Sequence, residues 1–170
     1  MVGPLEGARI EVIGPKHDRK SFASGAEALD RYLRTQAGQD ARKNMAATFV
    51  LVLSEGSIGG YYTLSSTALR LAELPQNVAR TLPRYPLVPA TLLERLAVDG
   101  RLRGRGCGRF PLADALHRAV RSEVASFAVI VDAKDEAARQ FYSRESILSL
   151  PDQPMKLLLP LDDVAKLFEG

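Results

Sequence analysis

The sequence predicts a single α/β domain over residues 1–170, with a mixed, twisted sheet and helices on both faces. Two patterns carry this prediction. Two β-rich runs in the first half of the chain are joined by a short polar turn, as in a hairpin, whereas the later strands alternate with amphipathic helices. A chain of 170 residues is long enough to form a sizeable core. Its composition, 46% hydrophobic and 25% charged, is that of an ordinary globular protein.

The first elements are a strand and two helices. Residues 9–13 (RIEVI) alternate between polar and apolar side chains, which indicates a strand. Residues 24–27 (SGAE) form a capping-box pattern that predicts a helix start, and Glu27 and Arg31 are spaced to form an ion pair on that helix. A second, shorter helical segment is expected at 39–47.

A hairpin and a long connection come next. Residues 48–53 and 58–64 are β-rich, and the polar turn between them predicts a hairpin whose tyrosines, Tyr61 and Tyr62, are expected in the core or a cleft. The connection at 65–90 has prolines at positions 83, 86 and 89, which argue against regular structure in its later part. A connection of this length in a small domain is often functional.

The central stretch of the chain combines a strand, a turn and a helix. Residues 92–98 form a short, mostly apolar run that fits a buried strand, and residues 101–108 are basic and rich in glycine. From Arg109 onward, apolar residues recur at the spacing of one helix face, at Leu112, Ala115, Leu116, Ala119 and Val120.

This arrangement favours binding of a phosphate or pyrophosphate. Glycines let the backbone turn tightly and approach a ligand, and the N–H groups at a helix start favour an anion. Arg103, Arg105 and Arg109 add positive charge. The lysine P-loop and the dinucleotide-binding fingerprint are not matched, because no Lys-Ser or Lys-Thr follows the glycines and because these glycines alternate along 104–108.

The last third of the chain predicts further strands and helices. Residues 127–131 (FAVIV) fit a buried strand, and the turn after it leads into a helix with Phe141 and Tyr142 on one face. The remaining expected elements are strands at 147–150 and 155–159 and a terminal helix at 162–168.

Composition and cysteine usage exclude several classes of protein. No apolar run approaches the roughly 18 residues of a membrane span, and the first residues lack the pattern of a signal peptide, so a cytosolic protein is the simplest interpretation. Cys107 is the only cysteine, which rules out an internal disulfide, and it is expected to be a packing residue. The two histidines and one cysteine lie far apart and predict no metal site. The net charge of +3, with a pI of about 9.2, permits a nucleic-acid partner without requiring one.

The turn at residues 103–108 (RGRGCG) matches the pattern R/Q-x-x-G-x-G/A and resembles the acyl-CoA pyrophosphate loop of the GNAT superfamily of N-acetyltransferases, whose order of strands and helices is also the one predicted here. Five stretches resemble, more narrowly, the toxins of type II toxin–antitoxin pairs, and they span nearly the whole chain: residues 17–44, 60–65, 82–86, 95–108 and 132–142. The resemblance implies an enzyme that transfers acetyl from acetyl-CoA to the α-amino group of an aminoacyl-tRNA and so blocks translation. It also implies a ribbon–helix–helix antitoxin that neutralises the toxin, and a homodimer.

The resemblance further implies where the co-substrate acetyl-CoA binds, with no metal involved. The strand residues expected to contact its pantetheine arm through their backbone are Leu96, Ala97 and Val98. Arg103 occupies the first position of the loop motif. The residues expected to hold the pyrophosphate through their backbone amides are Gly104, Arg105, Gly106, Cys107 and Gly108.

Tyr142 is the candidate catalytic residue, in the stretch 132–142 (DAKDEAARQFY). A tyrosine, with an unperturbed pKa of about 10, is a suitable acid for a departing thiolate, although helix periodicity alone would assign Tyr142 to the core. The acceptor amine needs no strong base, because an α-amino group has a pKa of about 7.7–8.0, against about 10.4 for lysine. This agrees with a sequence that shows no obvious pair of catalytic carboxylates.

A tRNA is held mainly through its phosphates, which requires basic side chains. Candidates lie near the two N-terminal helices and in the long connection: Lys20, Arg31, Arg34, Arg42, Lys43, Arg80 and Arg84. The antitoxin is expected to cover the same basic surface, so that inhibition is steric and electrostatic.

The sequence departs from the family pattern at 143–148, where Ser146 and Ile147 stand in place of a glycine and a phenylalanine. A catalytically impaired remnant that still binds acetyl-CoA or the antitoxin is therefore one alternative. The other is a GNAT enzyme that acts on a small-molecule or protein amine. Salt dependence separates this second alternative from a tRNA-acetylating toxin, because phosphate contacts make affinity fall steeply as salt rises.

Overall fold

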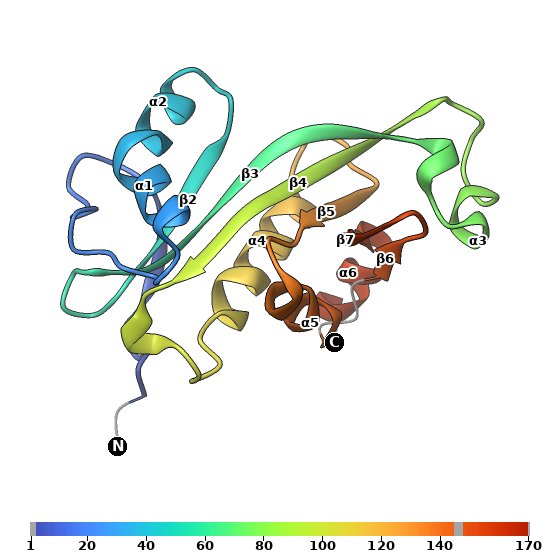
Figure 1. Ribbon diagram of the computed structural model, residues 1–170. Helices are drawn as coiled ribbons and strands as arrows, with labels where there is room; N and C mark the ends of the chain where they lie inside the picture. The colour runs from blue at the N-terminus through green and yellow to red at the C-terminus, as the bar shows by residue number, and fades with distance from the viewer. Residues whose placement is uncertain (1–2, 145–147, 170) are drawn as a thin grey trace. The chain divides into compact units, whose positions relative to one another are not determined.

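The chain is described by a computed structural model that covers residues 3–144 and 148–169 (Figure 1). Within these residues, one sheet contains the strands β1 (Arg9–Val12), β2 (Ala47–Val52), β3 (Ile58–Arg70), β4 (Leu87–Val98), β5 (Ala128–Asp132), β6 (Leu148–Leu150) and β7 (Gln153–Pro160). Their hydrogen-bonded order is β1-β2-β3-β4-β5-β7-β6. β2 is antiparallel to β1 and β3, β7 is antiparallel to β5 and β6, and β4 is parallel to β5, which confirms the predicted mixed sheet.

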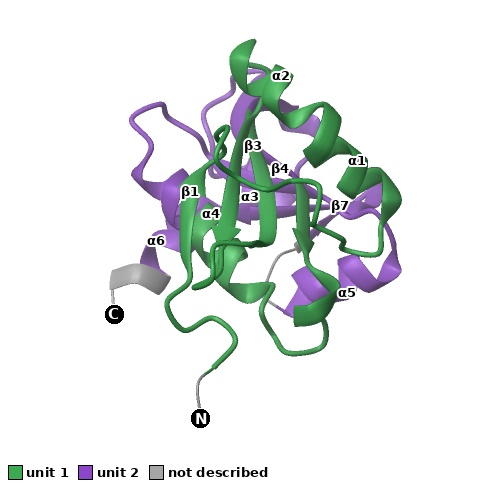
Figure 2. Ribbon diagram, turned by 90° about the vertical axis from the view of Figure 1, so that its left-hand side faces the viewer, with its two compact units in different colours: residues 1–65, 95–115 green, residues 66–94, 116–170 purple. Residues whose placement is uncertain are grey.

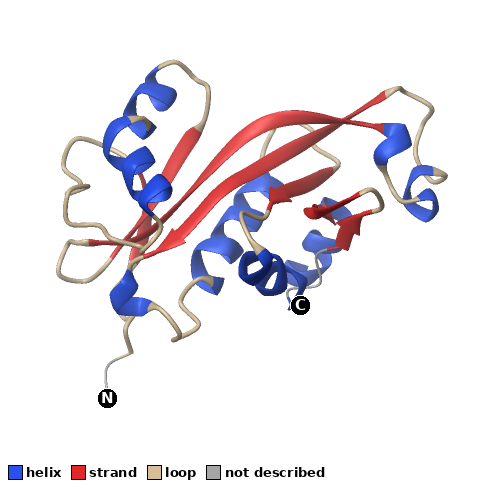
Figure 3. Ribbon diagram, viewed as in Figure 1, coloured by secondary structure: helices blue, strands red, loops and turns tan. Residues whose placement is uncertain are grey.

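The helices lie between and after the strands (Figure 3). They are α1 (Glu27–Thr35), α2 (Ala37–Arg42), η1 (Leu71–Glu73), α3 (Gln76–Ala79), η2 (Gly100–Leu102), α4 (Arg109–Arg121), α5 (Glu136–Arg144) and α6 (Leu161–Glu169). The order of elements is the predicted one, with three short helices added at η1, α3 and η2. The predicted α/β fold class is therefore confirmed.

Residue contacts divide the chain into two compact units (Figure 2). Unit 1 comprises residues 1–65 and 95–115, and unit 2 comprises residues 66–94 and 116–170. The long strands β3 and β4 each contribute residues to both units. Two clusters of buried apolar residues lie wholly within unit 1, and another lies wholly within unit 2.

Unit 1 buries both sides of β2. Val50 and Val52 belong to one apolar cluster together with Tyr61, and Leu51 and Leu53 belong to another. Successive side chains of a strand point to opposite faces, so this alternation follows directly from the strand geometry.

Tyr61 is a central residue of the first of these clusters. Its ring stacks on Tyr32 of α1 at a centroid distance of 6.4 Å and meets the edge of Phe22 at 5.7 Å. Its hydroxyl donates to the Leu29 carbonyl oxygen at 2.6 Å. Tyr61 and Tyr62 are both 0% exposed, so the two tyrosines that we expected in the core or a cleft are core residues.

Unit 2 is built around β5. Every residue from Ala128 to Val131 is at most 1% exposed. β5 pairs in parallel with β4, from Ala90↔Ala128 to Leu93↔Val131, and in antiparallel with β7 on its other edge. A strand that is covered in this way has a continuous apolar sequence instead of an alternating one, as residues 127–131 do.

The start of α1 differs from the prediction, and the capping box at residues 24–27 is not formed. Ala26 is the N-cap and provides no side-chain hydrogen bond. Ser24 instead donates its backbone N–H and its hydroxyl to Asp30 Oδ1, at 3.0 and 2.6 Å, and Gly25 takes a φ of +92°. This left-handed conformation, which glycine adopts most readily, moves the helix start to Glu27.

The connection predicted at 65–90 is shorter than expected, because β3 continues to Arg70 and β4 begins at Leu87. Pro89 lies inside β4, where its carbonyl oxygen accepts the Phe127 N–H at 2.8 Å. Proline is tolerated in a strand at a position where no N–H is needed for the ladder. Pro89 therefore did not exclude a strand, and the prediction was wrong for residues 87–90. Pro83 and Pro86 lie between α3 and β4, outside regular structure, as predicted.

Two other boundaries differ from the prediction. The second helix, expected at 39–47, is α2 and ends at Arg42, because Asn44 takes a left-handed φ of 58° that cannot continue a helix. The strand expected at 147–150 is β6 from Leu148 onward, and Ile147 lies outside the described residues.

Candidate functional site

The predicted pyrophosphate loop connects β4 with α4 in unit 1. The chain turns at Gly104 and Gly106, which have φ values of +75° and +73°, before α4 starts at Arg109. Side chains are strongly disfavoured in this left-handed region, so the backbone requires glycine at both positions. No atom of the described chain lies within 4 Å of a Cβ built on either glycine, apart from its own neighbours. The glycines therefore shape an open turn that leads into a helix, as the strand–turn–helix prediction requires.

Cys107 anchors this turn in the core. It is 3% exposed and packs in the second apolar cluster of unit 1, beside Leu53 and Leu102. This burial confirms that Cys107 is a packing residue. The neighbouring side chains of Arg105 and Arg109 are exposed.

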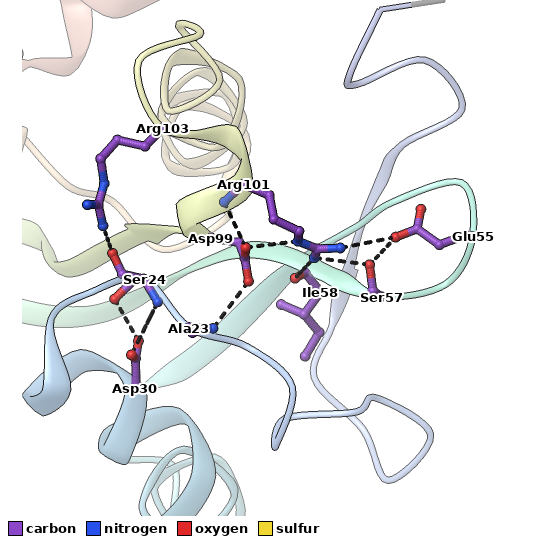
Figure 4. Close-up of polar contacts among 9 residues, drawn as sticks. All are labelled: Ala23, Ser24, Asp30, Glu55, Ser57, Ile58, Asp99, Arg101 and Arg103. Atoms are coloured by element: carbon purple, nitrogen blue, oxygen red, sulfur yellow. Dashed lines mark hydrogen bonds and ion pairs between the residues drawn. The ribbon is translucent and has the colours of Figure 1, made fainter.

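A buried carboxylate, Asp99, fixes the start of the turn to a distant part of the chain (Figure 4). Its Oδ1 accepts the backbone N–H and the Nε–H of Arg101 at 3.0 and 2.9 Å, and its Oδ2 accepts the Ala23 N–H at 3.2 Å. The Gly100 N–H also donates to the Ala23 carbonyl oxygen at 2.8 Å. The segment that precedes α1 is thereby joined to the turn that follows β4.

Asp99 is held in its ionised form. Burial alone would raise the pKa of Asp99. The hydrogen bonds from Arg101 and from the Ala23 N–H lower this pKa by more than burial raises it, so the pKa lies below the usual range of an aspartate. Arg101 reaches further, to the Ser57 hydroxyl at 3.3 Å and to Glu55 at 3.7 Å. The Asp99 charge therefore orders a network that includes the β2–β3 turn (Figure 4).

The Arg103 side chain makes a second link between the turn and α1. Its Nη2 donates to the Ser24 carbonyl oxygen (Figure 4). Its guanidinium also lies so close to Gly25 that a Cβ at that position would clash with it. Ser24 is itself held by Asp30 of α1. The side chain of Arg103, the first residue of the loop motif, therefore points toward the start of α1.

The predicted pantetheine-binding residues form the end of β4. Ala97 is buried, and Leu96 and Val98 are half-buried. β3 approaches closely at Gly60, where a Cβ would lie only 2.8 Å from the Ala97 carbonyl oxygen. The parallel register of β4 with β5 ends at Leu93, before these residues are reached.

Tyr142, the predicted catalytic acid, lies on α5 in unit 2. It is 6% exposed, and its ring meets the edge of Phe141 at a centroid distance of 5.2 Å. Burial raises the pKa of Tyr142 above that of an ordinary tyrosine, so the phenol is protonated at neutral pH. The two replacements named for the departure at 143–148, Ser146 and Ile147, lie outside the described residues.

Five of the predicted tRNA-binding residues are exposed in unit 1: Lys20, Arg31, Arg34, Arg42 and Lys43. Two of them share an acidic partner, because Glu27 Oε1 lies 3.6 Å from Arg31 Nη2 and 3.3 Å from Arg34 Nη2. The predicted pair of Glu27 with Arg31 is therefore confirmed. The charge that these two arginines present to a ligand is partly balanced.

The other two predicted tRNA-binding residues, Arg80 and Arg84, are exposed in unit 2. Arg84 lines an open groove of about 560 Å³ at the ends of β3 and β4, together with Arg70. The remaining lining is mainly apolar and comes from Leu71, Ala72, Ala79, Pro86 and Leu87. The groove thus combines two cations with an apolar surface.

Sequence reasoning missed Asp99, Arg101 and Ser24, which hold the turn in place. The pair Asp99-Gly100 directly after a strand was an available signal, because aspartate is a preferred helix N-cap and here accepts the N–H of Arg101 in η2. Its long-range partner, Ala23, lies 76 positions earlier and has no signature in the sequence.

Among the residues that the structure describes, no group of three or more histidine, cysteine, aspartate or glutamate side chains could hold a metal ion. The described helices include none that is both long and apolar enough to cross a lipid bilayer.

The chain is similar to known proteins both in sequence and in structure. No protein-family model matches the chain. The chain is 35% identical over 157 residues to the tRNA-acetylating toxin of Mycobacterium tuberculosis, a match that covers 91% of this chain and 93% of the relative. It is 26% identical over 169 residues to the probable toxin TacT of Sinorhizobium fredii, covering 93% of each.

Two solved structures are also similar to this chain. The structure of AtaT complexed with acetyl-methionyl-tRNAfMet superposes with a TM-score of 0.87 at 27% identity, covering 95% of this chain and 99% of that chain. The crystal structure of AtaTR bound with AcCoA superposes with a TM-score of 0.83 at 27% identity, covering 96% and 99%.

Proposed function

This chain belongs to the family of tRNA-acetylating toxins, and we propose from this premise that it transfers the acetyl group of acetyl-CoA to the α-amino group of an aminoacyl-tRNA. The observation that carries the proposal is the 35% identity, over 91% of the chain, to a toxin named for tRNA acetylation. The likeness to AtaT complexed with acetyl-methionyl-tRNAfMet supports a charged tRNA as the acceptor. The chain is thus an acetyl-CoA-dependent N-acetyltransferase of the GNAT fold.

Acetyl-CoA is proposed to bind along the end of β4 and the turn after it. The left-handed glycines Gly104 and Gly106 let the turn present its amides beside the start of α4, which suits a pyrophosphate. Residues 96–98 lie beyond Leu93, where the parallel register of β4 with β5 ends. Their backbone groups are therefore not used in that register, which supports a role for them in binding the pantetheine arm. The likeness to AtaTR bound with AcCoA supports the same ligand.

Acetyl transfer forms a carbon–nitrogen bond to the acceptor amine and breaks the carbon–sulfur bond of the thioester. The nitrogen loses one proton and the sulfur gains one, so the protons balance. Tyr142 is proposed to supply the proton to the sulfur, because its phenol is protonated at neutral pH and can donate a proton to a departing thiolate. The resulting phenolate recovers its proton from the acceptor ammonium, directly or through water.

The acceptor itself supports a mechanism without a strong general base. An α-amino group has a pKa of about 7.7–8.0, so an appreciable fraction is already neutral at cellular pH. The lone pair needed for attack is therefore present before any residue acts. The protein has to place this amine against the thioester and to assist the leaving group.

The tRNA is proposed to be held through its phosphates by the seven basic residues named above. In unit 2, the groove beside Arg70 and Arg84 supports this role, since guanidinium groups suit phosphates and the apolar lining suits a nucleobase or ribose. Affinity for tRNA should therefore fall steeply with salt.

We also propose a ribbon–helix–helix antitoxin as the inhibitory partner, and a homodimer as the assembly. An antitoxin that neutralises the basic residues would exclude tRNA by charge and by volume. Since charged tRNA and acetyl-CoA meet in the cytoplasm, we place the activity there.

Transfer of labelled acetyl from acetyl-CoA to a pool of charged tRNAs tests the function, with an uncharged pool as the control. We expect label on the charged pool alone, and sequencing of the labelled tRNAs would identify the species. Label transferred only to small amines or proteins would favour the alternative GNAT activity. Acetyl-CoA binding without any transfer would favour the impaired remnant.

A further inference from the structure

Two arginines from different segments of unit 1 converge on one glycine. Arg19 lies in the connection between β1 and α1, and Arg42 is the last residue of α2. The Nη1 atoms of Arg19 and Arg42 lie 3.1 and 3.3 Å from the place where a Cβ on Gly38 would be. The two cationic groups therefore meet over the same point of the backbone.

Neither of these arginines has an acidic partner among the described residues. This distinguishes them from Arg31 and Arg34, which share Glu27. Two like charges repel each other, so holding them side by side is unfavourable unless an anion lies between them. Arg42 is exposed and Arg19 is half-buried, so an anion can approach the pair from solvent.

Gly38 provides the space for this convergence. It lies within α2, where glycine is a poorer helix former than alanine, and its backbone is not in the left-handed region that favours glycine. A methyl group at this position would crowd both guanidinium groups. The absence of a side chain thus serves the approach of the two arginines.

We propose that Arg19 and Arg42 form a phosphate-binding pair over Gly38 that holds a backbone phosphate of the acceptor tRNA. The inference rests on the proposed function and deepens it, since sequence reasoning included Arg42 but not Arg19 among the tRNA contacts. A guanidinium presents several N–H groups in a planar fork, and two of them can surround one phosphate from two sides. The 3′-phosphate of acetyl-CoA has the same chemistry and is the other possible source.

Binding of deacylated tRNA, measured by filter retention over a series of salt concentrations, tests the pair. Each of Arg19→Ala and Arg42→Ala should weaken binding about threefold to tenfold, and the double variant should lower the salt slope by about one, as loss of one phosphate contact does. The second substitution should add less than the first, because both side chains contact one phosphate. Lysine at both positions should restore only part of the affinity, since it keeps the charge but not the fork.

Arg9→Ala is the matched control, because it removes one positive charge from unit 1 at an arginine that is paired with Glu11. It should leave tRNA affinity within about twofold of wild type, as expected for a balanced surface charge. Thermal unfolding of every variant verifies that the exposed substitutions leave the fold intact.

The other outcomes overturn the inference. If the paired variants lose affinity for acetyl-CoA but not for tRNA, the phosphate belongs to the co-substrate. If they lose only antitoxin binding, the pair recognises carboxylates of an acidic peptide. If wild type acetylates charged tRNA while the paired variants bind tRNA like Arg9→Ala, the pair has no role. If wild type does not acetylate charged tRNA, the proposed function fails first.

Discussion

Replacement of Asp99 by asparagine removes the charge at the start of the loop after β4 while keeping the size of the side chain. The carboxylate accepts three hydrogen bonds, two from Arg101 at 3.0 and 2.9 Å and one from Ala23 at 3.2 Å. If the asparagine oxygen keeps both Arg101 contacts, its amide group faces the Ala23 N–H and that hydrogen bond is lost. The turn then loses a tether to the segment before α1.

The magnitude follows from these contacts. A hydrogen bond to a charged group contributes about 1.5–3 kcal/mol. The Arg101 side chain is more than half exposed, so the loss of its ion pair adds less than about 1 kcal/mol. We therefore expect Asp99→Asn to lower the free energy of unfolding by about 2–3 kcal/mol. If half of this loss reaches the loop, acetyl-CoA binding weakens about tenfold.

The assay pairs urea unfolding with calorimetric titration of acetyl-CoA, and Asp40→Asn is the matched control. Asp40 also accepts two side-chain hydrogen bonds in unit 1, from Tyr32 at 2.7 Å and from Gln36 at 2.9 Å, but it makes none to the turn. It should lose stability and keep its affinity for acetyl-CoA. Wild-type affinity in Asp99→Asn would refute the reasoning, because the network would then stabilise the fold without positioning the loop.

Three further predictions concern catalysis, acid stability and the loop backbone. Tyr142→Phe should lower kcat about 10²–10⁴-fold, as loss of a general acid does, with little change in acetyl-CoA affinity, and equal losses of both would show a purely structural role. Because the pKa of Asp99 is lowered in the fold, its stabilising contribution should be complete above its unfolded pKa of about 3.8 and should fade as pH drops below it; acid titration of wild type against Asp99→Asn measures this difference, and parallel curves would contradict it. Gly104→Ala should cost about 1–2 kcal/mol of unfolding free energy and weaken acetyl-CoA binding, since alanine opposes the left-handed φ; unchanged affinity would remove this turn from the binding site.

The strand, turn and helix around the loop could be predicted because local patterns specify them. Apolar periodicity predicted a helix from Arg109 onward, and α4 spans Arg109–Arg121. Gly104 and Gly106, which have positive φ, belong to the alternating glycine pattern of the sequence. The buried character of β5 was equally visible in its uninterrupted apolar run. These features depend on residues that are close together in the sequence.

The rest depends on contacts that the sequence does not show. The capping-box pattern at residues 24–27 failed because Asp30 binds Ser24 and Gly25 adopts a left-handed conformation. The connection at 65–90 was overestimated because tertiary pairing extends β3 and β4 beyond the propensity of their residues. Asp99 and Arg19 gained their proposed roles only through partners far along the chain.

The most direct test of the central claim is to locate the acetyl group on the product. After reaction with charged tRNA, mild alkali cleaves the aminoacyl ester and mass spectrometry identifies what is released. Acetyl transfer to the α-amine predicts an N-acetylated amino acid and an unmodified tRNA. Acetyl found on the tRNA nucleosides, with an unmodified amino acid released, would contradict the proposal.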